Sequence, residues 1–349
     1  MTILAFLLWS IVKVVVVVVI FLMGVAYTVL LERKLVGRIQ NRWGPNRVGP
    51  FGLLQPLVDG AKSFLKEDII PTAVYKPLYL LAPVIALGCA LISIGVVPFG
   101  SPDITIGGMH LFQIADVNIG LLVILGITSI GVYGIALAGW SSNNKYSLLG
   151  SLRASAQLIS YELALGLSLV GVVMRAGSLN LREIVESQGK YGLLSWNLFG
   201  GMQFVAFFIY LMAAYAETNR SPFDLPEAES ELAAGYHTEY SSMKFAMFFM
   251  AEYGNMINVG CVATLLFLGG WTSPFGNALP LPHNIVLDSL LPIFWFVLKV
   301  FSFLFLYVWV RGTLPRFRYD QLMTFGWRYL MPLAILNILA TSLWISWRG

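Results

Sequence analysis

Two carboxylates stand inside long apolar stretches, where an ionised group is costly. Glu162 and Glu252 each follow a basic residue, Arg153 and Lys244, by about two helical turns. A glutamate side chain is too short to reach water from that depth, and ionisable groups within a membrane commonly mark proton or ion paths. Both residues could therefore take up and release protons. The alternatives are a structural ion pair, with Lys299 as partner, and a protonated glutamate buried between helices.

A second group of carboxylates lies in the segment 216–242, between two apolar stretches. An acidic run is usually a solvated loop, but apolar residues such as Phe223 and Leu225 are interleaved with this one, and Arg220 is its main counter-charge. Carboxylates crowded into a partly dry site repel one another and bind protons more readily. Such groups suit proton exchange at physiological pH. The acids are Glu217, Asp224, Glu227, Glu229, Glu231 and Glu239.

The cysteines and histidines point away from metal chemistry. Cys89 and Cys261 lie in apolar stretches outside any CxxC pattern, and the three histidines, His110, His237 and His283, are scattered. An iron–sulfur cluster needs about four thiolates, and a membrane haem usually needs two axial ligands. We therefore expect no metal and no redox cofactor on this chain. Electron chemistry must come from a partner or take place on a bound substrate.

The segment 32–71 is a third polar region and follows the first apolar stretch. Turns at Gly44-Pro45 and Gly49-Pro50 precede residues that alternate between an apolar and a charged face at helical spacing. This pattern predicts an amphipathic helix near 51–68 in the membrane interface. Such a helix either anchors the chain among lipid headgroups or frames an entrance for an amphiphilic ligand.

The composition defines the elements that must position these groups. Of 349 residues, 58% are hydrophobic and only 11% are charged, whereas soluble domains average about 25% charged residues. Soluble enzymes, nucleic-acid-binding proteins and disordered chains are thereby excluded. A membrane-spanning helix needs about 20 apolar residues. The sequence predicts an all-α polytopic membrane protein, a single domain over 1–349, with eight spans near 3–31, 79–99, 117–140, 154–174, 199–216, 245–270, 290–310 and 329–347.

The basic residues predict the orientation of these spans. Sixteen of the 22 Lys and Arg residues fall in the loops 32–78, 141–153, 217–244 and 311–328, and four fall on the opposite face. By the positive-inside rule these loops face the cytoplasm and both termini face outward. The first span is longer than a bilayer requires, so we expect it to tilt. The basic cluster follows this span, which predicts a signal anchor rather than a cleaved signal peptide.

Four long stretches between residues 32 and 323 resemble a known family, the H-subunit family of the proton-pumping NADH:quinone oxidoreductase (respiratory complex I). The resemblance implies eight transmembrane helices, no redox centre, a chamber that admits ubiquinone or menaquinone from the bilayer, and the start of a charged axis toward the antiporter-like subunits. The stretches are GRIQNRWGPNRVGPFGLLQPLVDGAKSFLKED, GWSSNNKYSLLGSLRASAQLISYE, AETNRSPFDLPEAESELAAGYHTEYSSMKFAMFFMAEY and RGTLPRFRYDQLM.

The resemblance also implies roles for individual residues. One departure from the family concerns the span 117–140, where some members carry a further glutamate. Here the polar residues are only Asn118, Thr128, Ser129 and Tyr133. Water or other groups would therefore have to connect the chamber to the membrane half-channel at this point. Quinone contacts are implied for Arg33, Lys34, Arg42, Gln55, Asp59, Gly60, Glu67, Arg220, Phe223 and Asp224. Coupling of quinone reduction to proton translocation is implied for Glu162, Glu217, Glu227, Glu229, Glu231 and Glu252.

On this basis we expect a subunit of a proton-translocating oxidoreductase, without a cofactor of its own and with quinone as substrate. FMN, NADH and the iron–sulfur clusters would lie on partner subunits. The expected partners are the other membrane-arm subunits, the quinone-reducing peripheral arm and membrane lipid, and not nucleic acid. The expected location is the bacterial inner membrane, in preference to the mitochondrial one. The alternatives are the equivalent subunit of an energy-converting hydrogenase, a stand-alone ion transporter and a purely structural anchor.

Overall fold

The computed structural model describes residues 3–101, 105–106, 109–110, 112–189, 192–224, 234–276 and 285–348. Helices dominate this part of the chain. The exception is one antiparallel ladder of two-residue strands, β1 (Thr105–Ile106) and β2 (Met109–His110), in which Thr105 lies opposite His110. The helical architecture expected from the sequence is confirmed, apart from this short hairpin.

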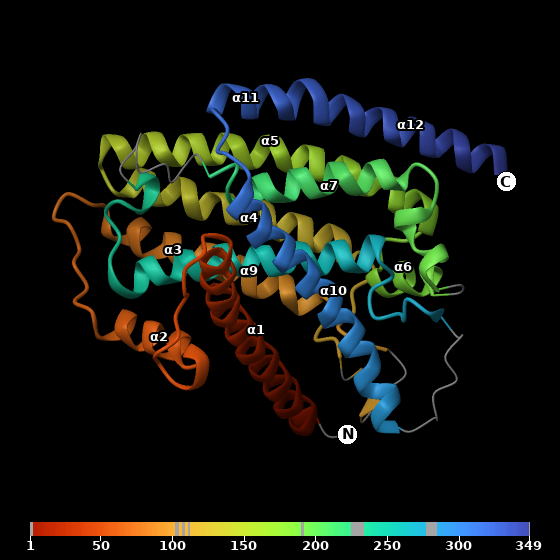
Figure 1. Cartoon of the computed structure of the whole chain (residues 1–349), viewed down its shortest axis with the longest axis horizontal. Helices are drawn as coiled ribbons and strands as arrows, with labels where there is room; N and C mark the ends of the chain where they lie inside the picture. Colours follow the sequence, from red (N-terminus) through yellow and green to blue (C-terminus); the bar gives the residue numbers. More distant parts are fainter. Residues whose placement is uncertain are drawn as a thin grey trace.

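Five helices run side by side through the centre of the described chain (Figure 1). Their apolar faces enclose one large core, in which Tyr161, Tyr210 and Phe267 are among the largest wholly buried side chains. The helix α12 (Met331–Arg348) packs along the outer side of α5. The five central helices are α3 (Lys76–Val96), α4 (Gly120–Ser141), α5 (Lys145–Ala176), α7 (Gln203–Glu217) and α9 (Ser242–Phe267).

Two long helices, α1 (Ile3–Ile39) and α10 (Ile285–Thr313), run obliquely to the central bundle and both contact α9 (Figure 1). With 37 residues, α1 is about 55 Å long at 1.5 Å per residue. This exceeds the hydrocarbon thickness of about 30 Å, and the tilt of this helix in a bilayer stays a prediction.

Short elements complete the ends of the bundle. In Figure 1, α2 and the α4–α5 junction lie at one end and α6 lies at the other. The α-helices are α2 (Gln55–Leu65), α6 (Leu181–Gln188) and α11 (Tyr319–Thr324), and a π-helical segment, η6 (Phe325–Leu330), joins α11 to α12. The 3-10 turns are η1 (Pro50–Gly52), η2 (Gly192–Ser195), η3 (Asn197–Phe199) and η4 (Gly235–His237).

Within the described ranges, six helical stretches are long and apolar enough to cross a membrane, and they coincide with six of the eight expected spans. The other two expected spans, 199–216 and 245–270, are helical but less apolar or shorter. The helix α7 has 15 residues, and α9 carries Lys244, Glu252, Asn255 and Asn258. The six stretches are Phe6–Ile39, Lys76–Val96, Gly120–Ser141, Lys145–Ala176, Ser289–Thr313 and Tyr319–Trp347.

Two expected loops, 141–153 and 311–328, prove to be largely helical. The side chain of Asn144 accepts a hydrogen bond from the Tyr146 amide at 3.0 Å. This N-cap starts α5 nine residues before the apolar stretch predicted at 154. The amphipathic helix, by contrast, starts later than predicted. It is expected over 51–68 but begins only at Gln55, because Phe51 and Gly52 have positive φ angles of 55° and 77°.

Candidate functional site

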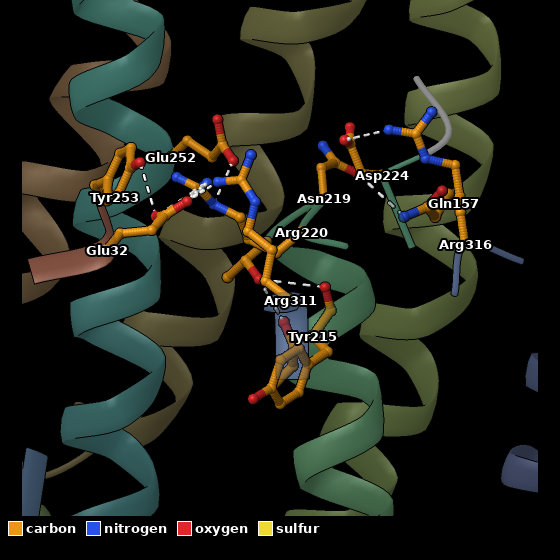
Figure 2. Close-up of polar contacts among 12 residues, drawn as sticks. Glu32, Gln157, Tyr215, Asn219, Arg220, Asp224, Glu252, Tyr253, Arg311 and Arg316 are labelled. Carbon is orange, nitrogen blue, oxygen red and sulfur yellow. Dashed lines mark hydrogen bonds and ion pairs between the residues drawn. The ribbon is translucent and has the colours of Figure 1, made fainter. Parts of the chain in front are cut away.

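A buried charge cluster lies where α1, α9 and the end of α10 meet the segment after α7 (Figure 2). At its centre the Nε of Arg220 lies 2.7 Å from Oε1 of Glu252, and Nη1 lies 3.4 Å from both carboxylate oxygens of Glu32. The hydroxyl of Tyr253 donates to Glu32 at 2.8 Å, and Arg311 forms a further ion pair with Glu32. Arg220 and Glu32 are only 7% and 6% exposed, so these charges are shielded from water.

The cluster contains two carboxylates and two guanidinium groups, so its charges balance. The guanidinium of Arg220 also lies over the ring of Tyr253, 3.9 Å from the ring centroid, which adds a cation–π contact. Buried charges are tolerated only when they are paired and hydrogen-bonded. The pairing therefore holds α1, α9, α10 and the segment after α7 in one fixed arrangement.

The segment that carries Arg220 is held in place by Gln157 of α5. This side chain is wholly buried. Its amide nitrogen donates to the carbonyl of Ala216 at 2.8 Å, to the carbonyl of Phe223 at 3.0 Å and to the side-chain oxygen of Asn219 at 3.1 Å. Figure 2 shows Gln157 beside Asn219. Because the acceptors lie on both sides of Arg220 in the chain, Gln157 fixes the turn between them.

A small polar cavity of about 50 Å³ adjoins the cluster between α4, α5, α7 and α9. Glu162, Glu217 and Glu252 all line it, so the structure brings together three of the carboxylates predicted from the sequence. The hydroxyl of Ser129 donates to Glu162. Oε2 of Glu217 is buried and has no hydrogen-bond partner among the described residues. The other polar lining residues are Thr128, Thr218, Asn219 and Asn255.

The cavity has the size and chemistry to hold water, since a water molecule needs about one probe sphere of space and two or more polar partners. Carboxylates that share such water can exchange protons along it. Ser129 and Thr128 lie in α4, within the span that lacks the glutamate of some family members. The hydroxyl of Ser129 reaches Glu162 at the place where the sequence lacks that glutamate, whereas the hydroxyl of Thr128, a residue that lines the cavity, donates to the carbonyl of Leu125 at 2.9 Å.

A second group of predicted residues joins α1 to α2. Nη1 of Arg33 lies 2.7 Å from Oδ2 of Asp59, and the side-chain amide of Gln55 donates to Oδ1 of Asp59 at 2.9 Å. The ammonium of Lys34 donates to the carbonyl of Phe51 at 2.5 Å. We call Arg33, Lys34, Gln55 and Asp59 the α1–α2 group. It lies near the surface, unlike the cluster around Arg220.

The apolar face of α2 is uncovered in the described chain, where Leu57 and Phe64 are 64% and 72% exposed. This is the arrangement of an amphipathic helix that lies in a membrane interface. The other end of α2 is tied to α9. The hydroxyl of Ser242 donates to the carbonyls of Ser63 and Lys66 at 3.0 and 2.9 Å, and Lys244 pairs with Asp68 at 2.8 Å.

Phe223 and Asp224 connect the turn after Arg220 to the segment after α10. The ring of Phe223 stacks on Phe317 with 5.5 Å between centroids, and Asp224 pairs with Arg316 at 3.1 Å. Figure 2 shows the Asp224–Arg316 pair beside Asn219 and Gln157, to the right of the cluster around Arg220. Phe223 and Asp224 are thus close to Arg220 in the sequence, and their contacts attach the turn to the segment after α10.

The remaining predicted residues lie apart from these groups. Arg42 is exposed and donates from Nε to Gln40 at 2.8 Å. Gly60 has open space at its Cβ position, and Glu67 is exposed beyond the end of α2. Glu227, Glu229 and Glu231 lie outside the described residues.

Several residues of the cluster are not predicted as site residues by the sequence. Glu32 and Arg311 directly follow the apolar stretches 3–31 and 290–310, where a charge normally meets water. Tyr253 and Gln157 look like ordinary helix residues. The only signal in the sequence is the position of Glu32 and Arg311 at span ends. Packing decides that Glu32 is buried and that Arg311 reaches it with a side chain that stays 40% exposed.

The ion pair considered for Lys299 is wrong. Its ammonium donates instead to the carbonyls of Leu268, Gly270 and Thr272 at 2.7, 2.8 and 2.8 Å. These carbonyls lie at the end of α9, where a helix leaves acceptors unsatisfied and favours a cation. Lys299 therefore has a structural role that is separate from Glu162 and Glu252.

Within the described ranges, no group of three or more His, Cys, Asp and Glu side chains has the arrangement of a metal site. Cys89 and Cys261 are buried, free thiols. The carboxylates that line the cavity can accept hydrogen bonds and can bind and release protons.

Comparisons with known proteins give a consistent result. A family model described as NADH dehydrogenase matches residues 12–342. The NADH-quinone oxidoreductase H subunit 2 of Koribacter versatilis is 64% identical, with 98% of both chains covered. The H subunit 1 of the same enzyme in Solibacter usitatus is 49% identical, again over 98% of both chains. The H subunit of Leptospira biflexa is 50% identical over 94% of this chain and 93% of its own.

Proposed function

Since the chain belongs to the NADH dehydrogenase family, with the H subunits of NADH-quinone oxidoreductase, we propose that it forms the portal and chamber for a quinone. We further propose that its buried carboxylates couple quinone reduction to proton movement. The names of the relatives include quinone, which favours this function over the hydrogenase subunit considered from the sequence. The chain contributes walls and charges, and the electrons arrive from a partner subunit.

One observation carries the coupling proposal: Glu162, Glu217 and Glu252 share a polar cavity, and Glu252 is also paired with Arg220 in the adjoining cluster. A unit charge placed 6 Å from a carboxylate changes its ionisation free energy by about 3 kcal/mol at an effective dielectric constant of about 20. Reduction of a quinone near the cluster would therefore redistribute protons among these groups. Glu227, Glu229 and Glu231 are proposed to extend the same path.

The portal proposal rests on the α1–α2 group and the uncovered apolar face of α2. A quinone has a long apolar tail and a polar head, so its portal needs an apolar wall beside a few charged groups. Leu57 and Phe64 supply such a wall, and Arg33, Lys34 and Asp59 supply the charges. Arg42, Gln55, Gly60 and Glu67 are proposed to border the same opening, and Arg220, Phe223 and Asp224 to face the quinone from the chamber side.

The proposed setting is a bacterial inner membrane that the chain crosses eight times, with α7 and α9 as the two spans beyond the six long apolar stretches. The loops rich in Lys and Arg would face the cytoplasm, and both termini would face outward. On the cytoplasmic side a peripheral arm with FMN and iron–sulfur clusters would dock. Charge complementarity would fix its register.

The coupling proposal is tested with Glu162→Gln and Glu217→Gln in the assembled enzyme, reconstituted in sealed vesicles. Each variant keeps the side-chain shape but cannot ionise. We expect the number of protons translocated per electron to fall while quinone can still bind. Glu183→Gln, an exposed glutamate of α6, is the matched control and should keep the wild-type ratio. A wild-type ratio in both Glu162→Gln and Glu217→Gln would contradict the coupling role.

A further inference from the structure

A second cavity, separate from the charge cluster, is apolar and measures about 600 Å³. It lies between α7, α10 and the α11–η6 segment, and we call it the α7–α10 groove. Its volume lies in the range of sites that hold small organic ligands. Residues that form its walls include Leu211 and Met212 of α7, Leu306 and Val310 of α10, and Phe325 and Tyr329 of η6.

The groove opens onto a surface of the described chain that carries exposed apolar side chains. The helix α10 and the α11–α12 stretch are both long and apolar enough to span a membrane. Large apolar side chains beside the groove, Phe305 and Trp309 on α10 and Leu333 on α12, are exposed. Walls that face an empty groove would lose their dispersion contacts. The chemistry of the walls therefore fits a hydrocarbon chain.

A segment rich in arginine borders one end of the groove, although Asp320 is the one charged residue among the described wall residues. The segment 311–328 contains four arginines and one acid, Asp320, which lines the groove. Arg316 and Arg318 have side chains that are 43% and 80% exposed, and they pair with Asp224 and Asp320 at 3.1 and 3.2 Å.

The Arg318–Asp320 pair is exposed on both sides and therefore weak. Asp224 is only 15% exposed, but the side chain of Arg316 is 43% exposed, so both guanidinium groups can also contact an added anion. Arg311 is paired with Glu32, and the three other arginines of the segment against Asp224 and Asp320 leave a formal charge of +1.

We propose that the α7–α10 groove binds one acyl chain of an anionic phospholipid, whose phosphate contacts Arg316 and Arg318. The planar guanidinium fork matches phosphate geometry, and basic pockets between membrane helices on the cytoplasmic side bind anionic headgroups. A chain of lipid would explain why an apolar groove ends in arginines. A partner protein would make use of these arginines only if it carried an acidic group at this point.

The bound lipid would also support the turn that carries Arg220. Tyr215 and Phe223 form part of the inner wall of the groove, and they flank Arg220 in the chain. Tyr215 stacks on Tyr307 at 3.9 Å between centroids, and Phe223 stacks on Phe317 at 5.5 Å. An acyl chain against these rings would therefore restrict the segment between α7 and the Gln157 contacts.

The test is photolabelling of the assembled oxidoreductase in vesicles that contain a phospholipid with a diazirine in one acyl chain. Two probes share the same chains: phosphatidylglycerol, which is anionic, and phosphatidylcholine, which is zwitterionic. We expect phosphatidylglycerol to label peptides from 211–215, 306–314 and 325–329 severalfold more than phosphatidylcholine. Equal labelling by the two probes, or no labelling of these peptides, would overturn the proposal; the latter result would show that protein covers the groove.

Variants separate the headgroup from the chain. The double variant Arg316→Gln/Arg318→Gln should reduce phosphatidylglycerol labelling to the level of phosphatidylcholine. Leu314→Trp, which adds bulk to a wall residue, should reduce labelling by both probes. Lys145→Gln on α5 and Leu122→Trp on α4 are matched controls, because both residues are exposed and neither helix contributes a wall residue to the groove. Loss of labelling in the controls to the same extent would also contradict the assigned site.

Discussion

At the scale of single residues, Arg220 makes the contacts that define the buried charge cluster. Its guanidinium meets carboxylates from two helices, Glu32 of α1 and Glu252 of α9, while its plane rests on Tyr253. A guanidinium has five N–H donors in a fixed fork and can serve two carboxylates at once. An ammonium at the same place would be a single point charge.

Removal of this guanidinium should destabilise the subunit strongly. In Arg220→Ala, two buried carboxylates lose a shared counter-charge, which costs roughly 3–5 kcal/mol for a buried pair. We expect less assembled enzyme and a lower thermal midpoint, as measured by native electrophoresis and by thermal denaturation. Arg220→Ala/Glu252→Gln should recover part of the loss, because one of the two charges is then absent.

The control for Arg220→Ala is Arg318→Ala, whose side chain is 80% exposed. Its ion pair lies in water, where pairs contribute about 0–1 kcal/mol. Equal thermal midpoints for Arg220→Ala and Arg318→Ala would show that the buried pairing does not stabilise the fold.

Gln157 should matter through the turn that it holds. Gln157→Leu keeps the approximate size of the side chain but removes the donor to Ala216, Asn219 and Phe223. Buried acceptors left without a donor cost about 1–3 kcal/mol. We expect faster hydrogen exchange of the backbone amides in 216–224, as measured by mass spectrometry. The control is Ser155→Ala on the same helix, and unchanged exchange in Gln157→Leu would rule out the clamp.

At the scale of elements, α2 is a short helix tied at both ends. Arg33 and Asp59 join it to α1, and Ser242 and Lys244 of α9 hold its C-terminal end. The helices α1 and α9 are the two that supply Glu32 and Glu252. The helix α2 therefore contacts both helices that carry these carboxylates.

The Arg33–Asp59 pair should govern quinone access more than stability. Its side chains are 49% and 35% exposed, so the pair adds at most about 1 kcal/mol to stability. We expect Asp59→Arg and Arg33→Asp each to raise the KM for quinone severalfold in steady-state assays. The double swap should restore part of the affinity. Lys62→Glu, an exposed charge reversal on the same helix, is the control, and an unchanged KM in both single variants would argue against the portal.

At the scale of the whole molecule, the cluster draws on residues from 32 to 311, and its parts meet only when the oblique helices pack on the bundle (Figure 1). The arrangement places α2 and the α4–α5 junction at one end of the bundle and α6 at the other. This separation, together with the distribution of Lys and Arg, predicts which ends face the two sides of the membrane.

Cysteine labelling tests that topology. Cys89 and Cys261 are buried, so they should react little with an impermeant maleimide. Lys145→Cys and Glu186→Cys replace exposed residues at opposite ends of the bundle. In intact spheroplasts we expect Glu186→Cys to react at once, and Lys145→Cys only after the membrane is permeabilised. The reverse pattern would invert the proposed orientation.

Some of this architecture is readable in the sequence because its cause is local. An apolar stretch long enough for a bilayer forms a helix wherever it lies, so the predicted spans near 79–99 and 117–140 coincide with α3 and α4. Capping is local too, yet the N-cap at Asn144 lies outside the apolar pattern and α5 begins earlier than predicted. The π-helical segment before α12 likewise has no counterpart in the hydropathy pattern.

The sequence by itself determined the class of protein, the approximate helices, the family resemblance and the importance of carboxylates in apolar surroundings. Only the tertiary structure decided that Glu252 pairs with Arg220, that Glu32 is buried beside them and paired with Arg311, and that Lys299 instead donates to the carbonyl of Leu268 at the end of α9. The physical reason is that burial and pairing of a charge depend on which helices pack against it. Residues 32, 220, 252 and 311 are far apart in the chain, and packing alone makes them neighbours.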